Sequence, residues 1–314
     1  SIFTILILTF IFLRFDIYQT FVSNKIKEMK QLITTVTIAL VMSSCANSIG
    51  QSTNTETAKE LTNKEKATAL LVSLETGDKA AAGYINPSNY KQHNLAVADG
   101  IEGFGEVLHH APEGGFKAKV VRSFQDGKYA FTHTIYDFFG PKIGFDIFKF
   151  NNGKIIEHWD NLSGINPVNP SNRTQTDGST NITDLDKTEA NKELVKSFVN
   201  TILMNGEFDK LGNYFDGDNY IQHNSMVADG LSGLGQALEA MAKNGIKMIY
   251  DTNHIVLGEG NFVLTVSEGK FGDKHTSYYD LFRVENGKIA EHWDVMETIL
   301  PASEHKNSNG KFNF

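Results

Sequence analysis

The sequence predicts an α+β fold that is present in two tandem copies, and three observations support this prediction. First, the block 92–105 returns as 222–235, and the block 152–160 returns as 286–294, in the same order and with nearly the same spacing. Second, each copy opens with apolar residues at helical spacing. Third, each copy closes with short alternating segments separated by turns, which is typical of an antiparallel sheet. Each copy has the length of a small domain, so we interpret the repeat as a duplicated domain rather than a solenoid.

The predicted helices occupy the first part of each copy. Leu70, Leu71 and Leu74 follow a helical spacing in the first copy, and the segment 194–202 does so in the second. A further helix is expected after a glycine-rich turn in each copy, at 103–110 and at 233–242. Four strands then follow in the first copy, with counterparts in the second, at 117–124, 129–136, 144–150 and 154–160. Helices followed by an antiparallel meander make an α+β plan.

The last hairpin of each copy determines which side chains share a face. The string Asn151-Asn152-Gly153 is suited to a three-residue turn. This register pairs Asp146 with His158 and gathers three polar groups on an apolar face, as expected for the floor of a ligand pocket. The face carries Asp146, Phe148, Phe150, Ile156, His158 and Asp160, and in the second copy Asp280, Phe282, Val284, Ala290, His292 and Asp294. The opposite face carries Trp159 and Trp293, which we expect to pack at an interface.

The composition indicates a globular protein without a nucleic-acid partner. The chain has 314 residues, of which 40% are apolar and 11% aromatic, enough for globular cores. The formal net charge of −8 argues against nucleic acid, because phosphate binding requires a basic surface. The expected partner is instead a small, partly apolar molecule.

The segment before residue 46 has the features of an export signal. Met29-Lys30 is followed by the apolar run 32–41 and then by Ser43-Ser44-Cys45, which is the layout of a secretory signal peptide. The small residues before Cys45 resemble a bacterial lipobox, which would make Cys45 the lipidated first residue of the mature protein. The alternative is a signal peptide that is cut nearby. We expect an exported protein of the bacterial cell envelope, lipid-anchored or periplasmic, whose only membrane contact is the lipid on Cys45.

The domain boundaries follow from these features and from local composition. Residues 1–28 lie before Met29 and are interpreted as upstream read-through or, alternatively, as an additional membrane-inserting segment. The rest of the chain is expected to contain a signal peptide (29–45), a flexible tether (46–63), a first domain (64–163), a linker (164–184), a second domain (185–300) and a loose polar tail (301–314).

Two strings in each copy resemble a known family. They are Tyr-x-Gln-His-Asn with a following Asp-Gly-x-x-Gly, and Asp-x-Phe with a following Asn-Gly-Lys-Ile-x-Glu-His-Trp-Asp. The strings resemble SnoaL-like proteins of the NTF2-like superfamily, and in particular the predicted SnoaL-like aldol-condensation-catalysing enzymes. The resemblance covers most of the chain after residue 64. It implies that each copy is a cone-shaped α+β barrel, in which N-terminal helices wrap a curved antiparallel sheet around a cavity.

The resemblance also implies, by position, which residues line the two cavities. The expected catalytic residues are Asp146, His158 and Asp160, with Asp280, His292 and Asp294 in the second copy. The expected substrate-binding residues are His93, Asn94 and His133, with His223 and Asn224 in the second copy. Val266 stands where a counterpart of His133 would stand, so the second cavity is impaired or altered if that histidine matters. Because single-domain members commonly form dimers, the two copies are candidates for an intrachain pseudo-dimer.

Histidine and aspartate side chains in an apolar pocket suit general acid–base chemistry, because burial moves both pKa values towards neutrality. We expect Asp160 or Asp146 to act as the base and His158 to act as its partner or as a proton shuttle. His93 and Asn94 are expected to donate hydrogen bonds to an enolate oxygen. These roles suit aldol-type cyclisation, isomerisation or dehydration of a small carbonyl compound, without a cofactor.

Two alternatives to this chemistry stay open. The chain is alternatively a non-catalytic ligand-binding lipoprotein of the envelope, and the Gln-His-Asn strings alternatively serve as turns, in which asparagine is common. A metal site is not expected, because neither copy contains closely spaced histidines within these strings.

Overall fold

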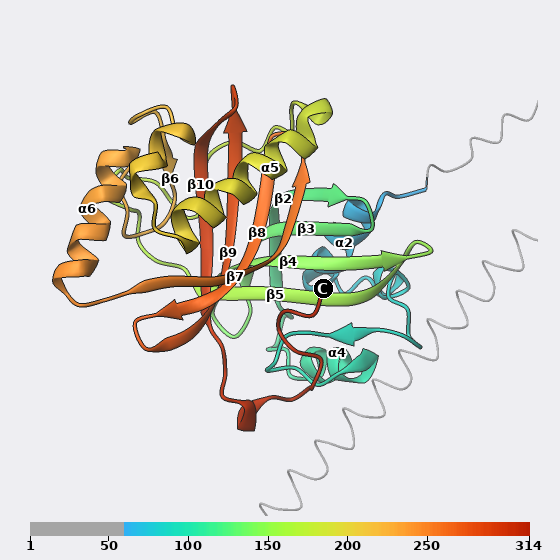
Figure 1. Cartoon of the computed structure of the whole chain (residues 1–314). Helices are drawn as coiled ribbons and strands as arrows, with labels where there is room; N and C mark the ends of the chain where they lie inside the picture. Colours follow the sequence, from blue (N-terminus) through green and yellow to red (C-terminus); the bar gives the residue numbers. More distant parts are fainter. Residues whose placement is uncertain (1–59) are drawn as a thin grey trace, which may run out of the picture. The chain divides into compact units, whose positions relative to one another are not determined.

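The computed structural model describes residues 60–314 (Figure 1). The expectations for residues 1–28, for the signal peptide at 29–45 with its lipidation at Cys45, and for most of the tether at 46–63 lie outside the described residues. Within residues 60–314, no helix is both long enough and apolar enough to cross a membrane.

The first half of the described chain places its helices before its long strands. The elements are α2 (Asn63–Thr76), α3 (Lys79–Ala82), β1 (Lys91–Gln92), α4 (Gly100–His109), β2 (Lys117–Asp126), β3 (Tyr129–Asp137), β4 (Pro141–Asn151) and β5 (Lys154–Gly164). Helix α2 begins at a capping box formed by Thr62 and Glu65, and it ends at Gly77 in the left-handed conformation. Its Leu70 and Leu71 are buried against the sheet, as their helical spacing predicted.

The second half has the same order of strands, with longer helical segments. The elements are η1 (Leu185–Lys187), α5 (Thr188–Phe198), η2 (Val199–Met204), η3 (Phe208–Asn213), β6 (Ile221–Gln222), α6 (Gly230–Lys243), β7 (Met248–Glu259), β8 (Phe262–Phe271), β9 (Lys274–Glu285), β10 (Lys288–Thr298) and η4 (Ala302–Glu304). Helix α5 continues into the π-helical turn η2, so that Val195, Phe198, Val199 and Ile202 form one buried stripe.

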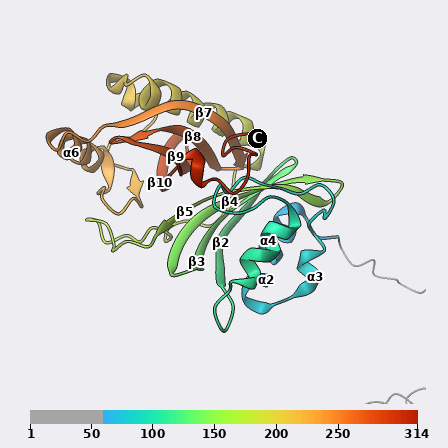
Figure 2. The same cartoon turned by 90° about the horizontal axis from the view of Figure 1, so that it is seen from below.

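Each half forms one five-stranded mixed sheet. The strand orders are β1-β5-β4-β3-β2 and β6-β10-β9-β8-β7. The short strands β1 and β6 run parallel to their neighbours, and the other pairs are antiparallel. Figure 2 shows the two sheets lying between the helices of the two halves. The α+β class expected from the sequence is confirmed, as is the meander of long strands after the helices.

The register of the last hairpin differs from the expected one. A two-residue turn and a bulge at Ile156 replace the three-residue turn. As a result, Asp146 pairs with Asp160 and not with His158. Because the difference is two residues along β5, the three polar side chains still share one face. The bulge also brings Ile155 to that face in place of Ile156, and β10 has the same irregularity.

The two tryptophans lie in a core that both sheets share. Trp159 and Trp293 are fully buried. They belong to one cluster with Phe124, Phe131, Ile143, Phe145, Ile147, Leu257, Phe262, Leu264, Val266, Tyr279, Leu281 and Val295. Two further cores lie between each sheet and its own helices. Each sheet is therefore covered by apolar side chains on one face and by helices on the other.

The linker 164–184 and the tail 301–314 are packed against the folded chain. The tail was expected to be loose because it is polar. The asparagine side chains of both segments instead donate hydrogen bonds to buried backbone carbonyls, and Asn169 and Lys311 are only 3% and 6% exposed. Apolar side chains of the same segments, Ile182, Phe312 and Phe314, pack against the shared core, and the ring of Phe314 stacks on Trp159. Hydrogen bonds and apolar contacts therefore order the two segments together.

Candidate functional site

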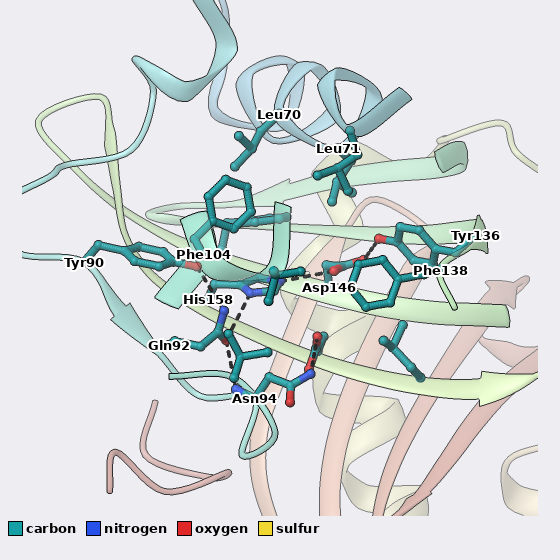
Figure 3. A pocket seen from close by; sticks show the side chains of 16 residues that line it. Leu70, Leu71, Tyr90, Gln92, Asn94, Phe104, Tyr136, Phe138, Asp146 and His158 are labelled. Atoms are coloured by element: carbon teal, nitrogen blue, oxygen red, sulfur yellow. Dashed lines mark hydrogen bonds and ion pairs between the residues drawn. The ribbon is translucent and has the colours of Figure 1, made fainter. Parts of the chain in front are cut away.

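A pocket lies between the helices of the first half and its sheet (Figure 3). Its apolar wall consists of Leu70, Leu71, Leu74, Val97, Phe104, Val107, Phe138, Phe148 and Leu162. Its polar wall consists of Tyr90, Gln92, Asn94, Tyr136, Asp146, His158 and Asp160. The pocket therefore suits a molecule with an apolar body and a polar group at one end.

Asp146, His158 and Asp160 meet on the polar wall, as the sequence predicted. Strands β4 and β5 place Asp146 directly opposite Asp160, and His158 is two residues away on the same face. The Nε2 atom of His158 lies 3.1 Å from Oδ1 of Asp146. The His158 ring stacks on Phe148, which fixes the plane of the ring.

Gln92 fixes the protonation of His158. The backbone N–H of Asn94 donates to Oε1 of Gln92, so this atom must be the amide oxygen. The same oxygen lies 3.2 Å from Nδ1 of His158, so Nδ1 must carry a hydrogen. A second proton therefore lies between Nε2 of His158 and Asp146, either on the imidazole or on the carboxyl group.

Two hydroxyl groups bind the other oxygen of Asp146. The hydroxyl of Tyr136 donates to Oδ2 of Asp146, and the hydroxyl of Thr132 donates to the same oxygen over 3.3 Å. Burial and the nearby Asp146 charge raise the pKa of Tyr136 well above its usual value, so its hydroxyl remains a donor.

Asp160 has one carboxylate oxygen with no hydrogen-bond partner in the described part of the chain. Oδ2 accepts a hydrogen bond of 2.8 Å from the side chain of Asn94, whereas Oδ1 is buried without a hydrogen bond. The nearest recorded cation is Nζ of Lys311, 3.9 Å from Oδ1. The residue is 6% exposed. An oxygen of this kind is a strong acceptor, because burial without a hydrogen bond leaves its basicity unsatisfied.

Tyr90 supplies a hydrogen-bond donor on the same wall. Its hydroxyl oxygen accepts a hydrogen bond of 3.2 Å from Nε2 of Gln92, and the structure gives the hydroxyl hydrogen no acceptor among residues 60–314. Burial raises the pKa of Tyr90, followed in effect by the charges of Asp160 and Asp146. The hydroxyl therefore stays protonated and is free to donate to a ligand oxygen.

The second half holds a larger pocket with a similar polar wall. Nε2 of His292 lies 3.0 Å from Oδ1 of Asp280, and Nδ1 lies 3.1 Å from Oε1 of Gln222. The side chain of Asn224 donates to Oδ2 of Asp294 over 2.7 Å. Burial raises the pKa of Asp294, and the neighbouring charge of Asp280 adds to this effect. Tyr220 corresponds to Tyr90. Its hydroxyl oxygen accepts a hydrogen bond of 3.1 Å from Nε2 of Gln222, and burial raises its pKa well above the usual value, so the hydroxyl stays protonated.

Three histidines that were expected in the cavities lie elsewhere. His93 stacks on Trp159 and faces Glu157 and a backbone carbonyl, on the face of the sheet opposite to the pocket. His223 lies in the same way on Trp293. The strand alternates its side chains, so Gln92 and Asn94 point into the pocket and the histidine between them points away.

His133 is also outside the first pocket. It is fully buried against Phe145 in the region between the sheets, and its Nδ1 accepts a hydrogen bond from Arg122. The register places Ile255 and Val266 where the first half has Arg122 and His133. An interacting polar pair is thus replaced by an apolar pair, and the absence of a histidine at Val266 has no consequence for the second pocket.

Several lining residues were missed by the sequence reasoning. Gln92 and Gln222 stand in the repeated strings but were overlooked in favour of the adjacent histidines. Tyr90 and Tyr220 also recur, two residues earlier, and this recurrence was the available signal. Tyr136 and Tyr250 do not occupy corresponding sequence positions, so comparing the copies could not identify them.

Asp146, His158 and Asp160 are also the one described group in which three ligating side chains converge. Their ligand atoms lie within 4.8 Å of one another. Two carboxylates and an imidazole are suitable ligands for a divalent transition metal. A metal ion at this position would have to displace the proton between His158 and Asp146, and it would lie near the ammonium of Lys311.

Comparisons with known proteins give likeness of fold only. No protein-family model and no curated protein matches the sequence. A protein of unknown function with a cystatin-like fold from Xanthomonas campestris matches with 23% identity over 34% of this chain and 89% of its own, at a TM-score of 0.30. An NTF2-like protein of unknown function from Cytophaga hutchinsonii matches with 16% identity over 34% and 94%, at a TM-score of 0.30. A SnoaL-like polyketide cyclase from Agrobacterium tumefaciens matches with 16% identity over 34% and 91%, at a TM-score of 0.28. Each of these matches spans about a third of the chain.

Proposed function

We propose that the two halves, 64–163 and 185–300, are SnoaL-like domains that each catalyse cofactor-independent acid–base chemistry on a small carbonyl compound. The reaction classes that suit the pockets are aldol-type cyclisation, isomerisation and dehydration. The observation that carries the proposal is the buried Oδ1 of Asp160, which has no hydrogen-bond partner among the described residues and lies beside the hydrogen-bonded pair of His158 and Asp146 in an apolar pocket.

Asp160 is the proposed base in the first pocket. Its carboxylate removes a proton from the carbon next to the carbonyl group, and the electrons of the C–H bond form an enolate. Asp146 is less suited to this role, because both of its oxygens already accept hydrogen bonds. Asp294 takes the same role in the second pocket.

The hydroxyl of Tyr90 is the proposed donor to the enolate oxygen. Its oxygen accepts a hydrogen bond from Gln92, which strengthens its own O–H as a donor. A fixed donor of this kind stabilises the negative charge that develops on the oxygen. The protonated Asp160 then returns the proton to carbon in an isomerisation, or gives it to a leaving hydroxyl group in a dehydration.

The proposal is tested with 2-tetralone, an apolar ketone with acidic hydrogens next to its carbonyl group. The full chain is incubated with the ketone in D₂O, and loss of the α-hydrogen signal is followed by ¹H NMR. We expect exchange well above that of the Asp160→Asn/Asp294→Asn variant. Equal exchange by the two proteins, with the ketone bound to both, would overturn the catalytic proposal.

The second candidate function is non-catalytic ligand binding. The apolar character of both pockets favours binding as much as it favours catalysis. Native mass spectrometry of the full chain, purified without added ligand, tests it against the variant His158→Ala/His292→Ala. A small molecule that accompanies only the wild-type chain, together with no exchange of 2-tetralone, would favour the binding function.

The proposed location is the bacterial cell envelope, with lipid attached to Cys45. The support is the sequence of the segment 29–45. Metabolic labelling with an alkyne-tagged fatty acid is expected to mark the wild-type chain and not the variant Cys45→Ser. Labelling of both proteins would contradict this location of the lipid.

A further inference from the structure

The linker and the tail make corresponding contacts with opposite halves of the chain. The tail follows the second half, yet Asn307 donates to the carbonyls of Asn94 and Val97 in the first half, over 2.7 and 2.9 Å. The linker follows the first half, yet Asn169 donates to the carbonyls of Gln222 and Val227 in the second half, over 2.7 and 2.9 Å. Each pocket loop is therefore held by a segment that continues from the other half.

We propose that each pocket is completed by the segment that continues from the other half. Asn307 in the tail is then a positioning residue for the first pocket, and Asn169 in the linker is one for the second. The segments are named here the tail clasp (306–311) and the linker clasp (169–174). Within each clasp the asparagine first shapes its own turn, because its Oδ1 accepts a backbone N–H two residues ahead. Its side-chain N–H groups are then directed at the loop.

The tail clasp holds the backbone of residues whose side chains form the polar wall. Asn309 donates to the carbonyl of Gln92 over 2.9 Å, and Lys311 donates to the carbonyl of Asp160 over 2.7 Å. Together with Asn307, the clasp binds the carbonyls of Gln92, Asn94 and Asp160. The side chains of these three residues are the ones that orient His158 and supply the proposed base.

The outward histidines connect the loops to the clasps. Nδ1 of His93 lies 2.7 Å from the carbonyl oxygen of Gly310, and Nδ1 of His223 lies 2.9 Å from that of Thr174. Each histidine also faces a glutamate through Nε2, Glu157 or Glu291. This accounts for the repeated Gln-His-Asn string, because its outer residue binds a clasp and its two inner residues line a pocket.

Close packing supports the same assignment for the linker clasp and the segment that follows it. Arg122 of the first half binds the carbonyls of Thr176, Asp177 and Ser179, and its guanidinium lies over the ring of Trp293. A Cβ atom on Gly178 would lie 2.0 Å from Oε1 of Glu291, so only glycine permits this approach. The linker is thus fixed to both halves.

The two loops provide an internal comparison, because corresponding amides are protected in the same way. The backbone N–H groups of Gln92, Asn94 and Val97 are hydrogen-bonded within one loop, and those of Gln222, Asn224 and Val227 within the other. Hydrogen exchange of the full chain, read at single amides by NMR, therefore reports both loops in one molecule.

Asn307→Ala is expected to accelerate amide exchange in 92–97 by roughly tenfold or more and to leave 222–227 unchanged, because two hydrogen bonds to the loop are lost. Asn169→Ala is expected to do the reverse. Ser308→Ala, at an exposed position between two clasp asparagines, is the control and should alter neither loop. The proposal would be overturned if Asn307→Ala accelerated exchange in 222–227 rather than 92–97, or if Asn169→Ala accelerated exchange in 92–97 rather than 222–227. Equal acceleration in both loops would also overturn it.

A spectroscopic measurement separates positioning from general stabilisation. The Nδ1–H resonance of His158 reports its bond to Gln92, and that of His292 reports its bond to Gln222. Asn307→Ala is expected to shift or broaden the first resonance only, whereas a purely structural role would leave both resonances in place. Lys311→Met is expected to act in the same direction, with recovery in Lys311→Arg.

The consequence for catalysis rests on the proposed function, whereas the exchange and imidazole measurements do not. If the proposed function is correct, Asn307→Ala lowers deuteration of 2-tetralone in the first pocket only, measured in the Asp294→Asn background. If the wild-type protein exchanges no hydrogen of the ketone, but the two asparagine variants change amide exchange as expected, the role of the clasps is supported and the acid–base function is contradicted.

Discussion

Tyr136 on β3 and Tyr250 on β7 bring their hydroxyl groups to corresponding carboxylates from strands that do not correspond. Tyr136 binds Asp146, and Tyr250 lies 3.3 Å from Oδ2 of Asp280. In the first sheet Tyr136 pairs with an alanine, and in the second Tyr250 pairs with a glycine. The tyrosine is thus on β3 in the first half and on β7, the counterpart of β2, in the second half. In both halves its hydroxyl lies within hydrogen-bonding distance of the carboxylate. This relationship indicates that a donor on this carboxylate matters to both pockets.

Whether the two positions of the tyrosine are equivalent can be tested by moving the tyrosine from β3 to β2 in the first half. Tyr136→Phe in the Asp294→Asn background is expected to lower deuteration of 2-tetralone by about tenfold to a hundredfold, because the carboxylate loses a charge-assisted hydrogen bond. The double variant Ala118→Tyr/Tyr136→Gly copies the arrangement of the second half and is expected to recover part of the rate. No recovery over Tyr136→Gly alone would show that the two placements are not equivalent.

Asp160→Asn is expected to remove the base of the first pocket without removing its fold. In the Asp294→Asn background the deuteration rate should fall by about a hundredfold to ten-thousandfold, the usual contribution of a general base. The free energy of unfolding should not decrease, because an unpartnered buried carboxylate oxygen is replaced by a neutral amide. Asp160→Glu controls for charge, and a normal rate in Asp160→Asn would assign the base elsewhere.

The second pocket should show a pH dependence set by Asp294. Burial raises the pKa of this carboxyl group, so the base form is populated only above the range of an ordinary aspartate. In the Asp160→Asn background, the deuteration rate should rise with pH through an apparent pKa above the usual aspartate value. A profile that is flat across this range would contradict the role of Asp294.

The same raised pKa has a consequence for stability. Between the ordinary and the raised pKa the folded state binds more protons than the unfolded chain, so the free energy of unfolding falls as pH rises through that window. Asp294→Asn is expected to reduce this fall. Urea denaturation at a series of pH values measures it, and an unchanged pH dependence in the variant would be inconsistent with the shift.

The sequence predicted the polar wall well, because the error in the register of the last hairpin left the same side chains on the same face of the sheet. The expected pairing of Asp146 with His158 was wrong, but a turn of two residues and one bulge changed the register by an even number. The parity of side chains on the strand was therefore unaffected. The repeated strings located β1 and β5. The parallel pairing of these two strands, which brings Gln92 beside His158, could be seen only in the structure.

The sequence failed where the inward or outward direction of a side chain depends on a strand of only two residues. In Lys91-Gln92 no alternation is long enough to show which residue faces the pocket, and the family resemblance had assigned the histidine after it to the cavity. The clasps were missed because their contacts join positions more than 200 residues apart, such as Asn307 and Asn94. Only a short Asn-rich similarity between the linker and the tail pointed to them.

His93→Ala tests the corrected role of the repeated histidine. His93 stacks on Trp159 and bonds to Glu157 and Gly310, so its loss should lower the free energy of unfolding by about 2–4 kcal/mol. Deuteration in the first pocket, measured per folded molecule in the Asp294→Asn background, should change far less than in Asp160→Asn. An equally large loss of rate at unchanged stability would return His93 to the catalytic wall.

The first pocket is expected to work without a metal and to be inhibited by one. Asp146, His158 and Asp160 bring three ligand atoms within 4.8 Å of one another, so added Zn²⁺ should bind there by displacing the proton shared by His158 and Asp146. Binding would occupy the carboxylate of Asp160 that the reaction requires as a base. Exhaustive dialysis against a chelator should therefore leave the deuteration rate unchanged, and micromolar Zn²⁺ should lower it in the Asp294→Asn background. Loss of the rate on dialysis, with recovery on adding Zn²⁺, would instead show that the three residues hold a catalytic metal.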